Sequence, residues 1–194
     1  MVKNFYIFRH GQSSYNLDDR IQGHLNNSVL TSKGIDQAYR AGELLANKNI
    51  ELIVSSPLRR ARQTSMILSK ILKTHVHFDD KLVEANLGVV EGMNRETAQK
   101  AYAEEYSKWL NPKHIDVSFK DGESKKSVIE RLFAALNKYA DSSYKNIALS
   151  GHKDALMQVL TVIKGDDKVP EMPNGSVIHL QFDGGNWKYV GMLQ

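Results

Sequence analysis

The sequence predicts an α/β fold, a three-layer α/β/α sandwich in which helices cover both faces of a mostly parallel, mixed sheet. Apolar runs of strand length alternate along the chain with segments of helical periodicity. The strand runs are almost continuously apolar, which is typical of strands buried on both faces. The 194 residues contain no linker, internal repeat or change of composition, so we expect a single domain, 1–194.

The first half of the chain is predicted to contain two strands, each followed by a helix. Residues 3–9 (KNFYIFR) form a buried strand. Thr31 is a suitable helix N-cap, and the helix after it runs to about residue 47, with apolar residues such as Ile35 at helical spacing. Residues 51–56 (ELIVSS) form the second strand. Pro57 then occupies a position that a first helical turn tolerates, and this helix continues to residue 72.

The second half is predicted to add one more strand–helix pair, two separate helices and a terminal hairpin. The elements in order are a short strand at 75–79, helices near 95–110 and 124–141, a buried strand at 145–151, a helix at 153–163, and a hairpin at 176–193 that turns around Asp183–Gly184–Gly185. A hairpin is antiparallel, so it makes the otherwise parallel sheet a mixed one.

The composition excludes several classes of protein. The chain has no cysteine, which removes disulfides, thiolate metal sites and enzymes with a cysteine nucleophile. The net charge of +4 is spread over single lysines rather than a dense basic run, so we expect no nucleic-acid partner. The longest apolar runs are too short to span a bilayer, and the first residues turn polar too soon for a leader. We therefore expect a cytoplasmic protein with no membrane partner.

Cationic and imidazole side chains follow three of the predicted strands. The first strand ends at Arg9 and is followed by His10; Arg59 and Arg60 come just after the second; His152 follows the late buried strand. Because ligands of α/β sheets gather at the carboxyl ends of the strands, we expect these groups at one edge. Guanidinium groups bind phosphoryl oxygens through paired hydrogen bonds, and a neutral imidazole can attack phosphorus. The pattern predicts a site for a phosphoryl group.

Such a site also needs a proton donor for the leaving oxygen. The segment KLVEANLGVVEG (81–92) offers two acids, Glu84 and Glu91. Clustered cations can stabilise a transferring phosphoryl group without a metal ion, so we expect no cofactor. His75 and His77 lie on one face of the short strand, but no third ligand is near them in the sequence, and we predict no metal site there.

Six segments of the chain form an ordered set of motifs. FRHGQSSYN (8–16) has the pattern R-H-G-[EQ]-[ST]-x-x-N, and SSPLRRARQT (55–64) has S-S-x-L-x-R-A-x-Q-T. The other four are LTSKGIDQA (30–38), LVEANLGVVEG (82–92), DGES (121–124) and LSGH (149–152). Together they cover nearly the whole chain and resemble the histidine phosphatase superfamily, in the branch that contains the cofactor-dependent phosphoglycerate mutases and related small phosphatases. The resemblance implies a phosphoglycerate mutase-like fold.

The resemblance also implies a role for each site residue. His10 would accept the phosphoryl group, while Arg9, Arg60 and His152 would hold its oxygens. Arg60, not Arg59, stands where the motif has its arginine, and Arg59 and Arg62 are expected to be surface charges. Glu84, favoured over Glu91 by its place in the motif, would be the general acid and then the base for water. The loop after His10 would line the phosphate or substrate pocket with Asn16, Gln22 and Gly23.

Two departures from the family pattern bear on function. Lys153 follows His152 where many members have glycine, and its side chain would crowd the pocket, contact the phosphate or point away. The chain is also shorter than the phosphoglycerate mutases of this branch, and its smaller members are mostly phosphatases.

The resemblance therefore favours a metal-independent phosphomonoester hydrolase that acts through a phosphohistidine on His10 and takes a small phosphorylated metabolite. The first alternative is a cofactor-dependent phosphoglycerate mutase. The second, motivated by Lys153 alone, is a catalytically weak phosphate-binding module. The identity of the metabolite and the oligomeric state stay open at this stage.

Overall fold

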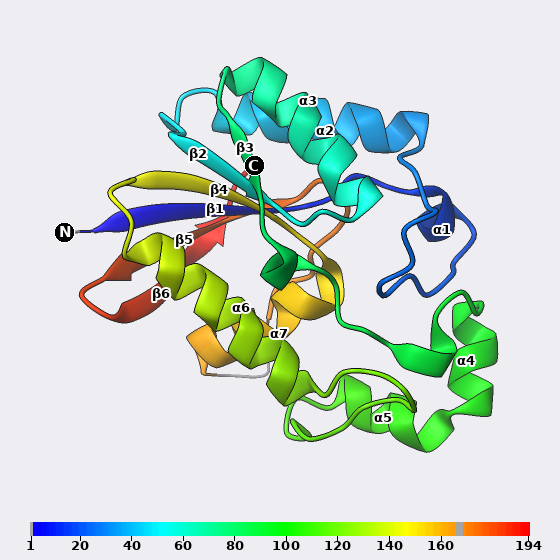
Figure 1. The fold of residues 1–194 in the computed structure, drawn as a ribbon. Coiled ribbons are helices and arrows are strands. Elements are labelled where there is room, and N and C mark those ends of the chain that lie inside the picture. The colour runs from blue at the N-terminus through cyan, green and yellow to red at the C-terminus, as the bar shows by residue number, and fades with distance from the viewer. Residues whose placement is uncertain (1, 166–168) are drawn as a thin grey trace.

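A six-stranded sheet lies between two layers of helices in the computed structural model, which describes residues 2–165 and 169–194 (Figure 1). The strands are β1 (Lys3–Arg9), β2 (Leu52–Ser55), β3 (Val76–Phe78), β4 (Asn146–Gly151), β5 (Val177–Asp183) and β6 (Asn186–Met192), in the order β3-β2-β4-β1-β5-β6. The first four strands in this order are parallel, and β5 pairs antiparallel with both β1 and β6. The mostly parallel, mixed sheet is confirmed.

Two pairs of longer helices form the outer layers (Figure 1). Helices α2 (Ser32–Leu45) and α3 (Arg59–Leu72) cover one face, and α6 (Lys125–Ala140) and α7 (Lys153–Lys164) cover the other. The short α1 (Ser14–Leu17) and the pair α4 (Arg95–Ala101) and α5 (Ala103–Leu110) lie outside these layers, toward the end at which β1 and β4 finish. The predicted three-layer α/β/α sandwich is therefore confirmed.

The two faces of the sheet build two apolar cores. Because successive strand residues point to opposite faces, Phe5 and Ile7 of β1 pack on the α6–α7 side, while Tyr6 and Phe8 pack on the α2–α3 side. Phe8 has no exposed surface. This double burial explains the continuously apolar strand sequence, and it fixes the end of β1 firmly at the edge where the polar motif begins.

Local sequence signals explain where most elements begin and end. The hydroxyl of Thr31 accepts the N–H of Gly34 at 3.1 Å and opens α2, as predicted. Gly165 ends α7 in the left-handed region, with a φ of 68°. Gly184 and Gly185 both have positive φ and form the two-residue turn between β5 and β6, so the predicted hairpin is confirmed.

Two local predictions were wrong. The helix expected near 95–110 is two helices, because Tyr102 leaves the helical region (φ −129°, ψ 46°) and lets α4 and α5 bury different faces against the same core. Pro57 lies before α3 rather than in its first turn, since Leu58 is the N-cap. Ile35 lies in α2, as its spacing predicts, but it is 41% exposed and lines a surface groove. Within the described residues, no helix combines the length and the apolar character needed to cross a membrane.

Candidate active site

The two histidines of the predicted site meet at the edge of the sheet where β1 and β4 end. These strands are parallel neighbours in register, with Arg9 opposite Gly151, so the next residues, His10 and His152, also lie side by side. Their ring centroids are 5.2 Å apart, and both side chains are almost completely buried. Parallel pairing therefore brings together two motifs that are far apart in the sequence.

His10 is held as a neutral imidazole with one nitrogen open. Its Nδ1 lies 2.7 Å from the carbonyl oxygen of Gly11, and because a carbonyl can only accept, Nδ1 carries the proton. The lone pair is then on Nε2. Burial, reinforced by the charges of Arg60 and Arg9, holds the pKa of His10 well below its usual 6.5. A neutral imidazole with a free Nε2 is a nucleophile at physiological pH.

The glycine after His10 is required by close contact with α2. A Cβ on Gly11 would lie 2.1 Å from the carbonyl oxygen of Gly34, and a Cβ on Gly34 would lie 2.0 Å from the carbonyl oxygen of Gln12. The amide of Gly11 also donates to the hydroxyl of Thr64 on α3, at 3.1 Å. The glycines of the two N-terminal motifs thus let α2 and α3 fix the backbone that carries His10.

Two guanidinium groups next to His10 are held by backbone carbonyls. Arg9 donates through Nη1 to Met172 at 2.7 Å, and Arg60 donates to Gly23 at 2.8 Å and to Leu25 at 2.9 Å. Carbonyl oxygens orient a guanidinium without neutralising it. Burial lowers the pKa of Arg60 to about 10, so it stays charged at neutral pH. The Nε atoms of both arginines are buried and have no partner within the described part of the chain.

Glu84 is the buried acid of the site. Its Oε1 accepts the backbone N–H groups of Ala155 at 2.7 Å and Ala85 at 3.0 Å. Its Oε2 lies 3.3 Å from the backbone nitrogen of Asp154. Burial raises the pKa of Glu84 to about 7, and the negative charge of Asp154 adds to this shift. A carboxyl group with this pKa can carry a proton at neutral pH and also lose it, which suits a group that acts as acid and then as base.

Glu91, the other acid in the same segment, has a different position. Its Oε1 accepts the backbone N–H groups of His24 and Leu87, both at 2.9 Å. Gly23 approaches it closely: a Cβ there would lie 1.9 Å from Oε1 of Glu91, and the φ of Gly23 is +48°. Glu91 therefore ties two loops together, whereas Glu84 lines the pocket that contains His10.

The backbone that carries Glu84 is clamped from α6. Arg131 donates to the carbonyl oxygens of Val83 at 2.8 Å and Glu84 at 2.9 Å, and pairs with Glu123 at 2.7 Å. The ring Nε2 of His24 lies 2.8 Å from the same carbonyl of Glu84. Glu123 belongs to the DGES segment, so this segment supports the acid from a distance. Arg131 was not predicted, because a single arginine within an amphipathic helix carries no local signal.

The remaining predicted residues lie around the same pocket. Asn16, Gln22, Gly23 and Lys153 line it together with His10, Arg9, Arg60 and Glu84. The amide oxygen of Asn16 accepts from Ser13 at 3.1 Å and from Asn174 at 3.2 Å, which leaves its Nδ2 group as a donor. Lys153 is one of the residues that line the pocket. His152 does not line this pocket; it is fully buried beside His10, with Nε2 2.8 Å from the hydroxyl of Ser56.

Three further charged residues line the pocket and were missed by sequence reasoning: Arg20, Arg95 and Asp154. A short antiparallel bridge between Arg20 and Asn94, next to a hydrogen bond of 2.9 Å from the N–H of Arg95 to Asp19, brings two loops together. Arg95 is held by the hydroxyl of Tyr106 at 2.8 Å and by the carboxylate of Asp19 at 3.2 Å. No sequence motif signals this pairing of loops.

His75 and His77 are not accompanied by further metal-ligating side chains. In residues 2–165 and 169–194, no group of three or more histidine, aspartate and glutamate side chains is placed to hold a metal ion. The cationic residues of the pocket outnumber its acids, Glu84 and Asp154. Such a site suits a dianionic phosphoryl group.

Comparison with known proteins finds relatives by sequence and by structure. A Hydrogenobacter thermophilus protein, named provisionally as phosphoserine phosphatase 2, is 31% identical over 165 residues, which cover 84% of this chain and 80% of that protein. A Citrobacter koseri protein, GpmB, named provisionally as a phosphoglycerate mutase, is 36% identical over 131 residues, which cover 68% of this chain and 60% of that protein.

Solved structures agree with the fold. A mycobacterial glucosyl-3-phosphoglycerate phosphatase in complex with VO3 matches with a TM-score of 0.88 at 25% identity, over 97% of this chain and 98% of that one. Bacillus stearothermophilus YhfR matches with the same TM-score and identity, over 97% of this chain and 95% of that one. Residues 5–193 match the family description "Histidine phosphatase superfamily (branch 1)". The chain therefore belongs to the histidine phosphatase superfamily, and it is an enzyme of the phosphatase or mutase type.

Proposed function

We propose that the protein is a metal-independent phosphomonoester hydrolase that forms a covalent phosphohistidine on His10 and uses Glu84 as general acid and then general base. The observation that carries the proposal is the neutral His10, with Nε2 open, beside the buried Arg60 and the half-buried Arg9, whose buried Nε donors have no partner in the described residues. A buried donor without a hydrogen-bond acceptor is unfavourable, so a bound ligand that supplies acceptors would stabilise these groups. Phosphoryl oxygens are acceptors that match the geometry of a guanidinium.

In the first step, Nε2 of His10 attacks phosphorus and the bond from phosphorus to the ester oxygen breaks. The leaving oxygen takes the proton of Glu84, so the alcohol departs neutral and Glu84 becomes a carboxylate. Arg9 and Arg60 stabilise the charge on the three phosphoryl oxygens during transfer. His152, buried beside the nucleophile, is proposed to contact the same oxygens.

In the second step, water attacks the phosphohistidine and the N–P bond breaks. Glu84 removes a proton from the water, inorganic phosphate leaves, and His10 returns to its neutral form with Glu84 protonated again. The raised pKa of Glu84, about 7, supports both roles near neutral pH. No other group is needed to balance the two steps.

The leaving group is proposed to carry a second negative charge. Besides the two guanidinium groups assigned to the phosphoryl group, the pocket has three more cationic lining residues: Arg20, Arg95 and Lys153. Among the described lining residues, the only acid besides Glu84 is Asp154. Two relatives are named for phosphoserine and glucosyl-3-phosphoglycerate, compounds that bear a carboxylate beside the phosphate. We therefore propose small carboxylated phosphomonoesters as the substrate class.

A phosphoglycerate mutase is the second candidate, and the likeness to GpmB at 36% identity favours it. A mutase uses the same phosphohistidine but returns the phosphoryl group to a substrate hydroxyl instead of water. The two reactions therefore differ only in the acceptor of the second step.

The experiment measures phosphate release in EDTA from 4-nitrophenyl phosphate, phosphoserine and phosphoglycerates, with a parallel mutase assay primed by 2,3-bisphosphoglycerate. Release that survives EDTA and disappears in His10→Ala supports the hydrolase. Activity in the mutase assay alone supports the second candidate. Binding of phosphorylated ligands with no turnover in either assay would show that the protein is the catalytically weak module. Arg95→Met should reduce kcat/KM for phosphoserine at least tenfold more than for 4-nitrophenyl phosphate, because only phosphoserine has the carboxylate.

A further inference from the structure

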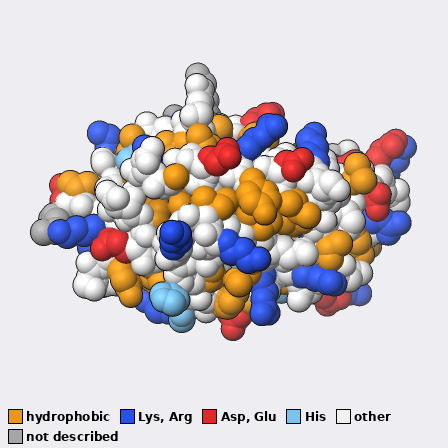
Figure 2. Space-filling view, turned by 90° about the horizontal axis from the view of Figure 1, so that it is seen from above, with side chains coloured by type: hydrophobic (Ala, Val, Ile, Leu, Met, Phe, Trp, Pro, Cys, Tyr) orange, Lys and Arg blue, Asp and Glu red, His pale blue; other side chains and the backbone are white. Residues whose placement is uncertain are grey.

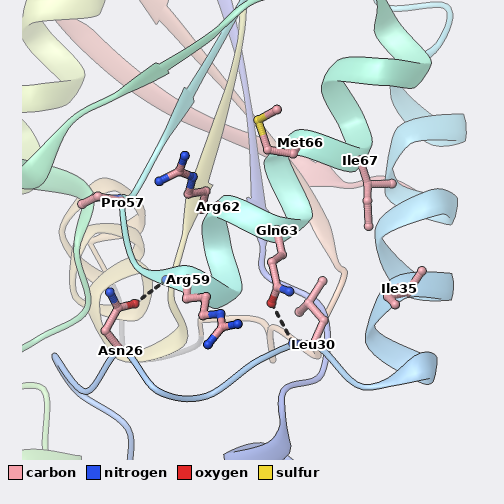
Figure 3. A pocket seen from close by; sticks show the side chains of 9 residues that line it. All are labelled: Asn26, Leu30, Ile35, Pro57, Arg59, Arg62, Gln63, Met66 and Ile67. Carbon is pink, nitrogen blue, oxygen red and sulfur yellow. Dashed lines mark hydrogen bonds between the residues drawn. The ribbon is translucent and has the colours of Figure 1, made fainter.

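A surface groove of about 740 Å³ lies beside the first turns of α3, apart from the catalytic pocket (Figure 3). Three segments form it: the loop at 26–30, the start of α2, and the stretch from Pro57 through α3. Its lining residues are Asn26, Leu30, Ile35, Pro57, Arg59, Arg62, Gln63, Met66 and Ile67. The volume is in the range of sites for small organic ligands, and the groove shares no lining residue with the pocket of His10.

The floor of the groove is apolar and open to solvent. Ile35 is 41% exposed and Met66 is 43% exposed, although both lie on helices that bury their other faces in the core. Figure 2, which views the molecule from the α2–α3 side, shows hydrophobic side chains gathered there among lysine and arginine side chains. An exposed apolar cluster with a charged border is typical of a ligand-binding surface.

Donors without acceptors border this floor. No hydrogen bond or ion pair occupies the guanidinium of Arg59 or Arg62 in the described structure; Arg62 only stacks over Phe78, at 5.1 Å from the ring centroid. Gln63 uses its amide oxygen to accept the N–H of Leu30 at 2.9 Å, so its NH₂ group remains a donor. Figure 3 shows Arg59 extending between Asn26 and Leu30. The lining contains no aspartate or glutamate.

We propose that this groove is a second ligand site, for a small amphipathic anion with an apolar body and a carboxylate or phosphate head. The head would bind the guanidinium of Arg59 through charge-assisted hydrogen bonds, and the charge of Arg62, whose guanidinium points the other way in Figure 3, would add to the attraction. The apolar body would cover Ile35 and Met66. A polar anion would leave the apolar floor in water, and an uncharged apolar molecule would leave the guanidiniums unmatched, so both parts are needed.

The same loop connects this groove to the catalytic pocket. Asn26 accepts the N–H of Arg59 through its side chain at 2.5 Å, on the groove side. The next residue of α3, Arg60, donates to the carbonyls of Gly23 and Leu25 on the pocket side. A ligand that presses on Asn26 and Leu30 would therefore act on the segment that orients the guanidinium of Arg60.

The test uses octanoate as the probe and follows backbone amide shifts of the full-length protein by NMR. Octanol supplies the apolar body alone and acetate supplies the head alone. We expect saturable shifts at residues 26–30 and 59–67 with octanoate, binding of octanol weaker by about tenfold or more, and no saturable shift with acetate. The double variant Arg59→Ala/Arg62→Ala should weaken octanoate binding by about tenfold or more, while the exposed Arg40→Ala on α2 should leave it unchanged.

Three outcomes would overturn the proposal. Equal affinity for octanol and octanoate would show that the guanidiniums bind nothing. Equal weakening by Arg40→Ala would show a general charge effect. Shifts centred on Asn16 and Gln22, or no saturable shift at all, would show that octanoate does not bind in the groove. Circular dichroism of each variant establishes folding, and Met66→Glu, which puts a carboxylate on the floor, gives a second loss-of-binding variant without touching either arginine.

Discussion

Replacing Glu84 with glutamine separates the catalytic role of this carboxyl group from its effect on folding. Glutamine has the same size and keeps an oxygen that can accept the N–H groups of Ala155 and Ala85. It cannot donate a proton to a leaving oxygen and it cannot become a buried charge. We therefore expect Glu84→Gln to lose activity and to gain stability at alkaline pH.

The loss of activity should depend on the leaving group. A positioned general acid contributes about 10²- to 10⁴-fold to rate, and the contribution is largest when the leaving alcohol is a poor one. With phosphoserine, whose leaving group is an alkoxide, kcat should fall within that range. With 4-nitrophenyl phosphate, whose leaving group is already a stable anion, the fall should be much smaller. In the wild type, kcat/KM for phosphoserine should decline as the pH rises through about 7, because Glu84 of the free enzyme loses its proton there.

The gain in stability follows from the rise of the pKa of Glu84 from 4.5 to about 7. Because the folded state holds this proton more tightly than the unfolded chain, the stabilisation is present below pH 4.5 and disappears as the pH rises through 7. A tenfold difference in proton affinity between the folded and unfolded states is worth about 1.4 kcal/mol. The contribution of Glu84 to the free energy of unfolding therefore falls by roughly 3 kcal/mol as the pH rises across this window. Glutamine avoids that loss but gives up the contact with the N–H of Asp154, worth about 1 kcal/mol. The net gain at pH 8 is about 2 kcal/mol.

The assay combines urea denaturation at pH 5 and pH 8 with kcat/KM for the two substrates. Glu91→Gln is the matched control, because Glu91 lies in the same segment but ties loops together through backbone N–H groups. The control should affect both substrates alike and should not become more stable at pH 8. Equal losses on phosphoserine and 4-nitrophenyl phosphate in Glu84→Gln would refute its role as proton donor, and lower stability at pH 8 would refute the raised pKa.

Three further results are expected. Burial holds the pKa of His10 well below 6.5, so the contribution of His10 to stability falls as the pH drops below about 6.5, where the unfolded chain takes up the proton. Relative to the wild type, His10→Asn should therefore gain in Tm between pH 7 and pH 5, and an equal change in Tm for both proteins would contradict this. Gly34→Ala should cost about 1–3 kcal/mol in urea denaturation and lower kcat, because its Cβ would lie 2.0 Å from a carbonyl oxygen, whereas Gly191→Ala, with open space, should cost less. Arg131→Met should lower the free energy of unfolding by about 2–3 kcal/mol, because it removes the hydrogen bonds to the backbone of Glu84 and the pair with Glu123. It should also lower kcat for phosphoserine more than for 4-nitrophenyl phosphate. Equal effects on both substrates would indicate a structural role alone.

The sheet and the strand ends could be predicted from the sequence because their causes are local. Continuous apolar runs define strands buried on both faces, and the carboxyl ends of parallel strands must meet at one edge. That reasoning alone brings His10 and His152 together, and the structure places their rings 5.2 Å apart. The assignments of Asn16 and Gln22 came from the resemblance, since nothing in their local pattern distinguishes them from other loop residues.

The rest could not be predicted because it depends on contacts between loops. Arg95 reaches the pocket through the bridge between Arg20 and Asn94, and such a bridge has no periodicity in the sequence. The exposure of Arg59 and Arg62 was predicted correctly, but the groove that they border requires the loop at 26–30 to lie against α3. The motif favours Glu84 over Glu91, but the different contacts of the two acids become visible only when the loops are in place.

The way the cations are held explains how a buried acid can be protonated when it is needed. Arg9 and Arg60 are oriented by carbonyl oxygens, which leave their charges intact, so the empty pocket is positive and Arg60 lowers the pKa of Glu84. A phosphoryl dianion would neutralise these guanidiniums and add negative charge beside Glu84. Both changes favour the protonated carboxyl, so substrate binding should raise the pKa of Glu84 above its value in the empty site. In the proposed mechanism, the phosphoryl group passes to His10 as the alcohol leaves with the proton of Glu84. The remaining carboxylate then faces water, which is the state that a general base requires.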